Sequence, residues 1–337
     1  MTTILTRIGL AAALALAAPA TGQAAEHTLR ISSWGPPTSQ INTVMWPALI
    51  ELMETATDGK VTGEIVYNLA APPAQFDLIL DGAADMTWIF MGYNPGRFVS
   101  PRLLEMPGYG ASSESLSAAY WDVQEKYFAA ANEYDGVKLV GMMAHGPGQL
   151  HTIDRITSLK ELEGMKIRTG GGVAADVVAA LGASRIQGPA PKAYETIASK
   201  AADGAVLTIE GRESYRLVEV APYMLEMPGG YYRGAFALIM NQDRFDGLPD
   251  DIRAQLDAVF GHEASKVAGK TWDIADEIGL QATRDTPGNE IIPASAEDVE
   301  AFKALSAEIR KTVIAEVAAA GIPAQEAYDM LIELTSE

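Results

Sequence analysis

Two patterns of apolar and polar residues follow one another along the chain. Short apolar or alternating stretches are typical of buried and half-buried strands, whereas longer stretches with apolar residues every three or four positions are typical of amphipathic helices. The expected strands are 28–32, 64–68, 85–90, 137–144, 165–168, 185–187, 204–209 and 235–240. The expected helices are 41–53, 74–81, 113–134, 173–181, 191–202, 249–282, 295–320 and 322–334. This alternation predicts an α/β fold with mostly parallel sheets flanked by helices.

Two of the expected strands are interpreted as passages between two lobes. Strand 137–144 runs into His145-Gly146-Pro147-Gly148, and strand 235–240 brings the chain back. Two passages predict a double-hinged clamshell that closes around a ligand about the segments 145–152 and 234–241. The predicted division is a lobe I from 26–147 and 236–260, a lobe II from 148–235 and 286–320, a long helix at 249–282 and a C-terminal helix within 321–337.

The first 25 residues have the three parts of a cleavable signal peptide. Arg7 supplies the positive charge, 8–18 is apolar, and small residues at 22–25 predict cleavage after Ala24 or Ala25. No later stretch approaches the ~20 apolar residues that a membrane helix needs. The chain has no cysteine, which excludes disulfides and thiol chemistry. We therefore expect a soluble periplasmic protein, and we expect it to be a monomer.

The net charge of −19 makes nucleic acid and anionic membrane surfaces poor partners. An anionic ligand would have to be bound locally, by a few cations held in a cleft. Arg168 is the best candidate, because it lies at the end of an expected strand, directly before Gly170-Gly171-Gly172 and an expected helix. A helix start favours negative charge, and a guanidinium can grip a carboxylate with two parallel hydrogen bonds. The alternative is an exposed arginine beside an ordinary glycine loop.

The sequence gives little indication of dinucleotide binding, metal binding or catalysis. Gly170 to Ala175 matches the dinucleotide pattern G-x-G-x-x-A, but the acidic residue expected on a second strand is missing, since Glu195 falls in a helix. The four histidines show no metal-ligand spacing, and no G-x-S-x-G motif is present. We therefore expect no cofactor, no metal and no catalytic residues. A binding protein is favoured, and an exported enzyme acting on an organic acid is the alternative.

Several stretches together resemble the DctP-type solute-binding proteins of tripartite ATP-independent periplasmic (TRAP) transporters. They are LDGAADMTWIFMGYNPGRF (80–98), HGPGQLHT (145–152), SLKELEGMKIRTGGG (158–172), AADGA (201–205) and MNQDRFDGLPDDIRAQL (240–256). The resemblance implies a two-lobe periplasmic-binding-protein clamshell in which the long helix spans both lobes. It also implies capture of an organic acid and delivery to a membrane permease. The arginine that holds the substrate carboxylate in the family corresponds to Arg168.

The sequence departs from the family at two positions that bear on the ligand. Many members have a second arginine where this chain has Gln149, and many have Asn-Pro where it has Leu207-Thr208. A ligand with two carboxylates would lose partners at both positions, so we expect a monocarboxylate with an apolar or aromatic body.

Further ligand-binding residues are expected around Arg168. They are Gln149, the aromatic residues Trp34, Trp88, Phe90 and Tyr93, and Glu210. Each aromatic residue has core packing as its alternative role. Glu210 either accepts a hydrogen bond from a ligand hydroxyl or begins the next helix.

Overall fold

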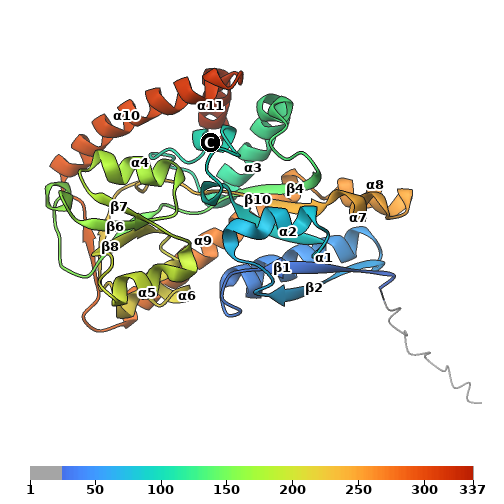
Figure 1. The fold of residues 1–337 in the computed structure, drawn as a ribbon, viewed down its shortest axis with the longest axis horizontal. Coiled ribbons are helices and arrows are strands. Elements are labelled where there is room, and N and C mark those ends of the chain that lie inside the picture. Colours follow the sequence, from blue (N-terminus) through green and yellow to red (C-terminus); the bar gives the residue numbers. More distant parts are fainter. Residues whose placement is uncertain (1–24, 337) are drawn as a thin grey trace, which may run out of the picture.

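The protein consists of two lobes, each built on one β-sheet with helices packed against it (Figure 1). The structure is a computed structural model that describes residues 25–336, so the predicted signal peptide lies outside the described residues apart from Ala25. The first sheet has the order β2-β1-β3-β10-β4, with β1 His27–Ser33, β2 Val61–Tyr67, β3 Met86–Phe90, β10 Ala235–Asn241 and β4 Val137–Ala144. The second has the order β11-β9-β5-β8-β6-β7, with β11 Glu290–Pro293, β9 Tyr223–Glu226, β5 Gln149–Thr152, β8 Gly204–Leu207, β6 Lys166–Thr169 and β7 Ser184–Gln187.

The predicted α/β fold is confirmed, and both sheets are mixed. Strand β1 is parallel to β2 and β3, β6 is parallel to β7 and β8, and β11 is parallel to β9. The antiparallel strands are β10, beside β3 and β4, and β5, beside β8 and β9. These are the two strands that enter a sheet from the other lobe. The short strands β5, β9 and β11 were not expected from the sequence.

The helices cover both faces of each sheet, as the alternating pattern predicts. They are α1 Trp46–Ala56, α2 Gln75–Leu80, α3 Ser113–Val123, α4 Gly172–Ala180, α5 Ala193–Ala198, α6 Gly211–Ser214, α7 Gln242–Asp246, α8 Asp250–Asp257, α9 His262–Asp285, α10 Ala296–Ala319 and α11 Ala324–Leu334. Helix α3 is shorter than the predicted 113–134, since irregular helical turns follow it to Ala131. Ser295 caps α10 by accepting a hydrogen bond from the Asp298 N–H. No described helix is both long and apolar enough for a bilayer.

The predicted long helix at 249–282 is wrong in one respect, because the chain breaks it into α8 and α9. Gly261 lies at the break with φ of +81°, a conformation that glycine adopts readily. A Cβ at this position would lie 2.5 Å from the ring of Trp121, so packing also requires glycine. The remaining α9 spans both lobes as expected, since it packs on α3 and β4 in lobe I and on α6 and β11 in lobe II.

Helix α10 also reaches both lobes, which revises the predicted placement of 286–320 in lobe II alone. It begins beyond the second sheet, contacts α4, and ends against α11 and the short helical turn Ser100–Leu103 of lobe I (Figure 1). One buried apolar cluster accordingly contains residues of both lobes.

The two passages between the lobes lie side by side. The N–H of Gly148 donates to Tyr232 O at 3.0 Å, and the N–H of Tyr231 donates to Gly148 O at 2.8 Å. The N–H of His145 donates to Gly234 O at 3.2 Å. Helix α9 runs against this pair, close enough that a Cβ at Gly146 would overlap Oδ2 of Asp276. Three segments of chain therefore cross between the lobes at one place.

Candidate functional site

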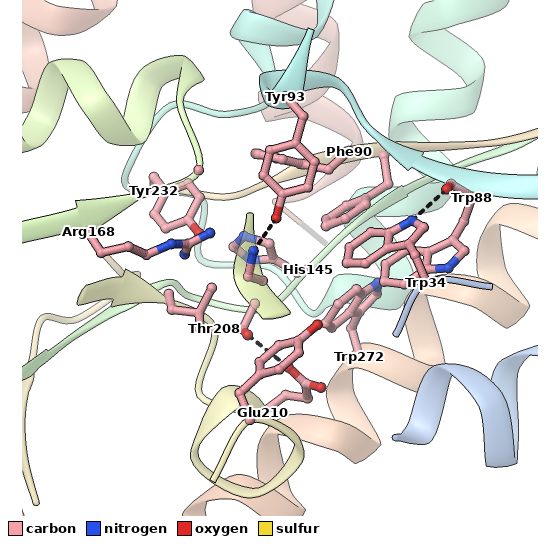
Figure 2. A pocket seen from close by; sticks show the side chains of 15 residues that line it. Trp34, Trp88, Phe90, Tyr93, His145, Arg168, Thr208, Glu210, Tyr232 and Trp272 are labelled. Carbon is pink, nitrogen blue, oxygen red and sulfur yellow. Dashed lines mark hydrogen bonds between the residues drawn. The ribbon is translucent and has the colours of Figure 1, made fainter. Parts of the chain in front are cut away.

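A cavity lies between the lobes, next to the crossing segments, and aromatic side chains form much of its wall (Figure 2). About 370 Å³ of space not filled by protein atoms lies between the lining residues, including space that is open to solvent. Residues of β3, β6 and β8 reach it from the carboxyl ends of their strands, where open α/β sheets bind ligands. The lining residues are Trp34, Trp88, Phe90, Tyr93, His145, Arg168, Gly170, Ala190, Leu207, Thr208, Glu210, Tyr215, Tyr232, Phe236 and Trp272.

Arg168 supplies a buried positive charge to this cavity. Its side chain lies near the end of β6 and is 1% exposed. Nε and Nη2 donate to the same acceptor, Gly188 O, at 3.0 and 2.5 Å, whereas the buried Nη1 has no partner. Among the described residues, no carboxylate forms an ion pair with Arg168. A buried cation without a counter-charge is costly, and an anionic ligand would remove that cost.

The start of α4, predicted as part of the anion site, already holds a carboxylate of the protein itself. Oε2 of Glu105 accepts a hydrogen bond from the Val173 N–H at 2.8 Å. Burial, the largest influence, raises the pKa of Glu105 to about 7. The Gly171 N–H is also engaged, since it donates to Thr169 Oγ1 at 2.9 Å. Of the three glycines, only Gly170 lines the cavity, so the predicted helix-start contribution to ligand binding is corrected.

The aromatic residues line the cavity and pack on one another at the same time. The rings of Trp34 and Trp88 stack at 3.8 Å with an interplanar angle of 8°, and Nε1 of Trp34 donates to Trp88 O at 2.9 Å. Phe90 and Tyr93 meet edge to face at 4.7 Å, and Phe236 packs on Trp88 at 5.6 Å. Packing on neighbouring rings is therefore compatible with the expected ligand-binding role of these residues, and the stacking holds the rings of the wall in place.

Tyr93 links the two lobes across the cavity. It follows β3 in lobe I, and its hydroxyl oxygen accepts a hydrogen bond from the Ala190 N–H of lobe II at 2.7 Å. Burial raises the pKa of Tyr93, and the positive charge of Arg168 opposes that rise. The phenol is therefore neutral at physiological pH.

Glu210 both lines the cavity and begins α6, so its two expected roles are compatible. Its side chain is 3% exposed, and Oε2 accepts a hydrogen bond from the Thr208 hydroxyl at 3.0 Å. Its N–H donates to Oδ1 of Asp276 on α9 at 3.0 Å. Burial is the main cause that raises the pKa of Glu210, and burial also raises the pKa of Asp276 to about 8.

Gln149 is engaged away from the cavity. Its Nε2 donates to Met227 O at 3.0 Å, and its Oε1 accepts from the Met227 N–H at 2.8 Å. Both polar atoms of the amide therefore tie β5 to the returning passage, and Gln149 is not among the cavity-lining residues. We remove it from the expected ligand-binding set. Its place beside the hinge in sequence could not reveal which side of the strand it faces.

Among the lining residues that were not expected from the sequence, five carry rings: His145, Tyr215, Tyr232, Phe236 and Trp272. Phe236 belongs to the apolar β10 and Trp272 to the middle of α9, where the sequence pattern is that of any core position. His145 and Tyr232 lie on the two adjacent passages. For His145, the position within the predicted hinge segment 145–152 was the one available signal, whereas Tyr232 precedes the predicted segment 234–241. Among residues 25–336, no cluster of histidine and acidic side chains is suited to hold a metal ion.

Two lobes, a cavity between them and a buried unpaired arginine in its wall define a clamshell solute-binding protein. A sequence model of the bacterial extracellular solute-binding proteins, family 7 (DctP), matches residues 33–316. The chain therefore belongs to this family, which confirms the resemblance and the two-lobe architecture. The family consists of periplasmic solute-binding proteins.

Solved structures of TRAP periplasmic solute-binding proteins are similar over 92% of this chain. One from Bordetella bronchiseptica, with bound (R)- and (S)-mandelate, has 32% identity, 98% coverage of its own chain and a TM-score of 0.88. One from Rhodoferax ferrireducens, with copurified benzoate, has 26% identity, 97% coverage and a TM-score of 0.85. A marine metagenome protein specific for aromatic acids, in complex with metahydroxyphenylacetate, has 25% identity, 98% coverage and a TM-score of 0.84.

Proposed function

We propose that this protein binds a small aromatic monocarboxylate between its lobes and delivers it to the membrane permease of a TRAP transporter. The observation that carries this proposal is the buried Nη1 of Arg168, which has no partner in the cavity wall. A ligand carboxylate beside Nη1 would pair the charge and the unused donor together. The mandelate, benzoate and metahydroxyphenylacetate ligands of the similar proteins are acids of this class.

The charges around the cavity favour one carboxylate and an apolar body. Arg168 is the only lysine or arginine among the lining residues, and Glu210 is the only acidic residue among them. A second ligand carboxylate would face Glu210 without a compensating cation. The remaining wall is dominated by the rings of Trp34, Trp88 and Phe236, which offer flat apolar surfaces to an aromatic ring.

The proposal includes the route of the ligand. The chain is exported through the signal peptide at 1–25, works in the periplasm as a monomer and closes its lobes about the crossing segments when the ligand binds. It releases the acid chemically unchanged to the permease. The two alternative functions, an exported enzyme acting on an organic acid and a sensor that presents its ligand to a receptor, use the same cavity.

A thermal-shift screen tests the ligand class directly. Benzoate, phenylacetate and mandelate are compared with succinate, pyruvate and acetate at equal concentrations. Binding at ~100 times Kd stabilises the folded state by ~2.7 kcal/mol, which is visible as a rise in melting temperature. We expect the aromatic monocarboxylates to give the largest shifts, and mass spectrometry to recover them unchanged. Larger shifts with succinate would contradict the proposed class, and chemical conversion would support the enzyme.

A further inference from the structure

The cavity wall contains two buried polar side-chain atoms without a hydrogen-bond partner. One is Nη1 of Arg168, a donor, and the other is Nε2 of His145. Buried polar atoms in folded proteins are nearly always paired, so an unpaired atom in a ligand cavity indicates where a ligand group binds. Arg168 accounts for the carboxylate in the proposed function. His145 has no role there and requires an explanation of its own.

The hydrogen bonds of His145 show which kind of group its Nε2 can bind. Nδ1 lies 2.5 Å from Gly146 O. A carbonyl oxygen only accepts hydrogen bonds, so Nδ1 carries the hydrogen and donates it. The side chain is 2% exposed, and burial lowers the pKa of His145 to about 3, so the ring is neutral at physiological pH. In a neutral ring with hydrogen on Nδ1, Nε2 is a hydrogen-bond acceptor.

Rings and a glycine surround His145, and none of them supplies a donor to Nε2. Tyr232 meets the imidazole edge to face at 4.8 Å, and the rings of Phe236 and Trp272 each lie 5.9 Å away. A Cβ at Gly234 would overlap Nε2, so the glycine backbone lies close to this edge of the imidazole and brings no side-chain donor to it. The acceptor is therefore embedded in the apolar part of the wall, where an aromatic ligand body would lie (Figure 2).

Arg168 and His145 are both close to Tyr232. The Tyr232 ring contacts the imidazole, and the positive charge of Arg168 acts on the Tyr232 phenol, lowering its pKa against the larger rise that burial causes. Arg168, His145 and Tyr232 all line the same cavity, so one bound acid can meet both the cation and the free acceptor.

We propose that Nε2 of His145 accepts a hydrogen bond from a hydroxyl group of the bound acid, so that the site selects hydroxylated aromatic monocarboxylates over their plain analogues. This proposal rests on the proposed function and specifies its substrate class. A plain acid would satisfy Arg168 and leave Nε2 unpaired in a dry environment. A site built to bond a hydroxyl rejects the analogue that lacks it, because its own polar group is then left unpaired.

Isothermal titration with two matched pairs of acids tests this selection in the wild-type protein. The pairs are mandelate with phenylacetate, and 3-hydroxybenzoate with benzoate. We expect the hydroxylated member of at least one pair to bind about tenfold more tightly or better, which is the effect of one well-made hydrogen bond. Equal affinities within both pairs would overturn the selection while leaving the proposed function intact. Failure of all four acids to bind would count against the proposed function itself.

Variants of His145 then assign the effect to Nε2. In His145→Phe the ratio of the two dissociation constants should fall to near one, because the acceptor is lost and the aromatic ring is kept. In His145→Gln, whose side-chain oxygen can accept a hydrogen bond, part of the ratio should return. His262→Gln is the matched control, because His262 is half exposed and pairs with Asp122 outside the cavity. A ratio that persists in His145→Phe would overturn the assignment.

Discussion

One hydrogen bond of Tyr93 joins the lobes at the edge of the cavity. Its hydroxyl oxygen accepts a hydrogen bond from the Ala190 N–H of lobe II at 2.7 Å. The bond can form only when the two lobes are as close as they are in this structure. At the residue scale, Tyr93 therefore belongs both to the cavity wall and to the contact between the lobes.

Replacing Tyr93 by phenylalanine should weaken ligand binding without unfolding the protein. A net loss of ~0.5–1.5 kcal/mol, typical of one hydrogen bond, corresponds to roughly a threefold to tenfold rise in Kd. Titration calorimetry with benzoate measures this change. Tyr67→Phe, at an exposed tyrosine on β2, serves as the control. An unchanged Kd in Tyr93→Phe would show that the bond to Ala190 does not contribute to ligand capture.

Single residues differ in how far the sequence could place them. The position of Arg168 could be predicted, because a strand, a glycine turn and a helix start follow one another within a short stretch. Glu105 could not be assigned to the start of α4, since the two are distant in sequence and meet only when the lobes pack. The orientation of Gln149 could not be predicted either, because its side-chain amide bonds to the backbone of Met227, which is distant in sequence. Local periodicity carries no information on such partners.

At the scale of elements, Gly146 is the closest point between the first passage and α9. A Cβ there would overlap Oδ2 of Asp276, whose Oδ1 is already held by the Glu210 N–H. The carboxylate therefore has little freedom to move away. This arrangement allows only glycine at position 146 while the lobes are in their present orientation.

Gly146→Ala should disfavour this arrangement of the lobes. We expect ligand affinity to fall by at least about tenfold, which corresponds to ~1.4 kcal/mol. Small-angle scattering should give a smaller radius of gyration for wild-type protein with saturating benzoate than without it, and little change for Gly146→Ala. Gly110→Ala is the control, because a Cβ there meets no atom within 4 Å. Wild-type compaction in the Gly146 variant would refute the role assigned to this contact.

The elements that the sequence predicted well are those with several turns or several alternating positions. Strands β1, β3, β4 and β10 and helix α10 agree with the prediction to within one or two residues. The break at Gly261 was missed, because the apolar pattern continues on both sides of it and the cause is the distant ring of Trp121. The boundary of an element that is set by tertiary packing can be predicted only when the residue it packs against is known.

For the whole molecule, buried ionisable groups should make stability depend on pH. Burial raises the pKa of Asp276 from 3.8 to about 8 and that of Glu105 from 4.5 to about 7. A folded state with a raised carboxyl pKa holds protons more tightly than the unfolded chain, so its stability falls as pH rises through that interval. His145 and His151 act oppositely, since burial lowers their pKa from 6.5 to about 3 and stability rises with pH between those values.

Above pH 6.5 the histidine contribution is complete, and only the carboxyl contribution still changes. We therefore expect the melting temperature of the ligand-free protein to fall between pH 6.5 and 8.5. Asp276→Asn keeps the oxygen that accepts the Glu210 N–H but cannot ionise. At pH 8.5 it should exceed the wild type in stability by at least about 1.4 kcal/mol, the equivalent of one pKa unit, and by less at pH 5. If the difference in stability between Asp276→Asn and the wild type were the same at pH 5 and pH 8.5, ionisation of Asp276 would not be its cause.

The central claim of this account is that Arg168 holds the carboxylate of the ligand. Truncating one partner of a buried charge pair typically costs ~2–5 kcal/mol of binding, or roughly 30-fold to several-thousand-fold in affinity. Lysine keeps the charge but cannot present two parallel donors, so it should not restore binding fully. The melting temperature without ligand should change little in either variant, because within residues 25–336 the guanidinium donates hydrogen bonds to Gly188 O alone.

Titration of benzoate and mandelate into wild type, Arg168→Ala and Arg168→Lys is the most direct measurement. The account predicts measurable binding to the wild type, a loss of at least 30-fold in the alanine variant and a partial loss in the lysine variant, with melting temperatures close together in the absence of ligand. Near wild-type affinity for both acids in Arg168→Ala would contradict it.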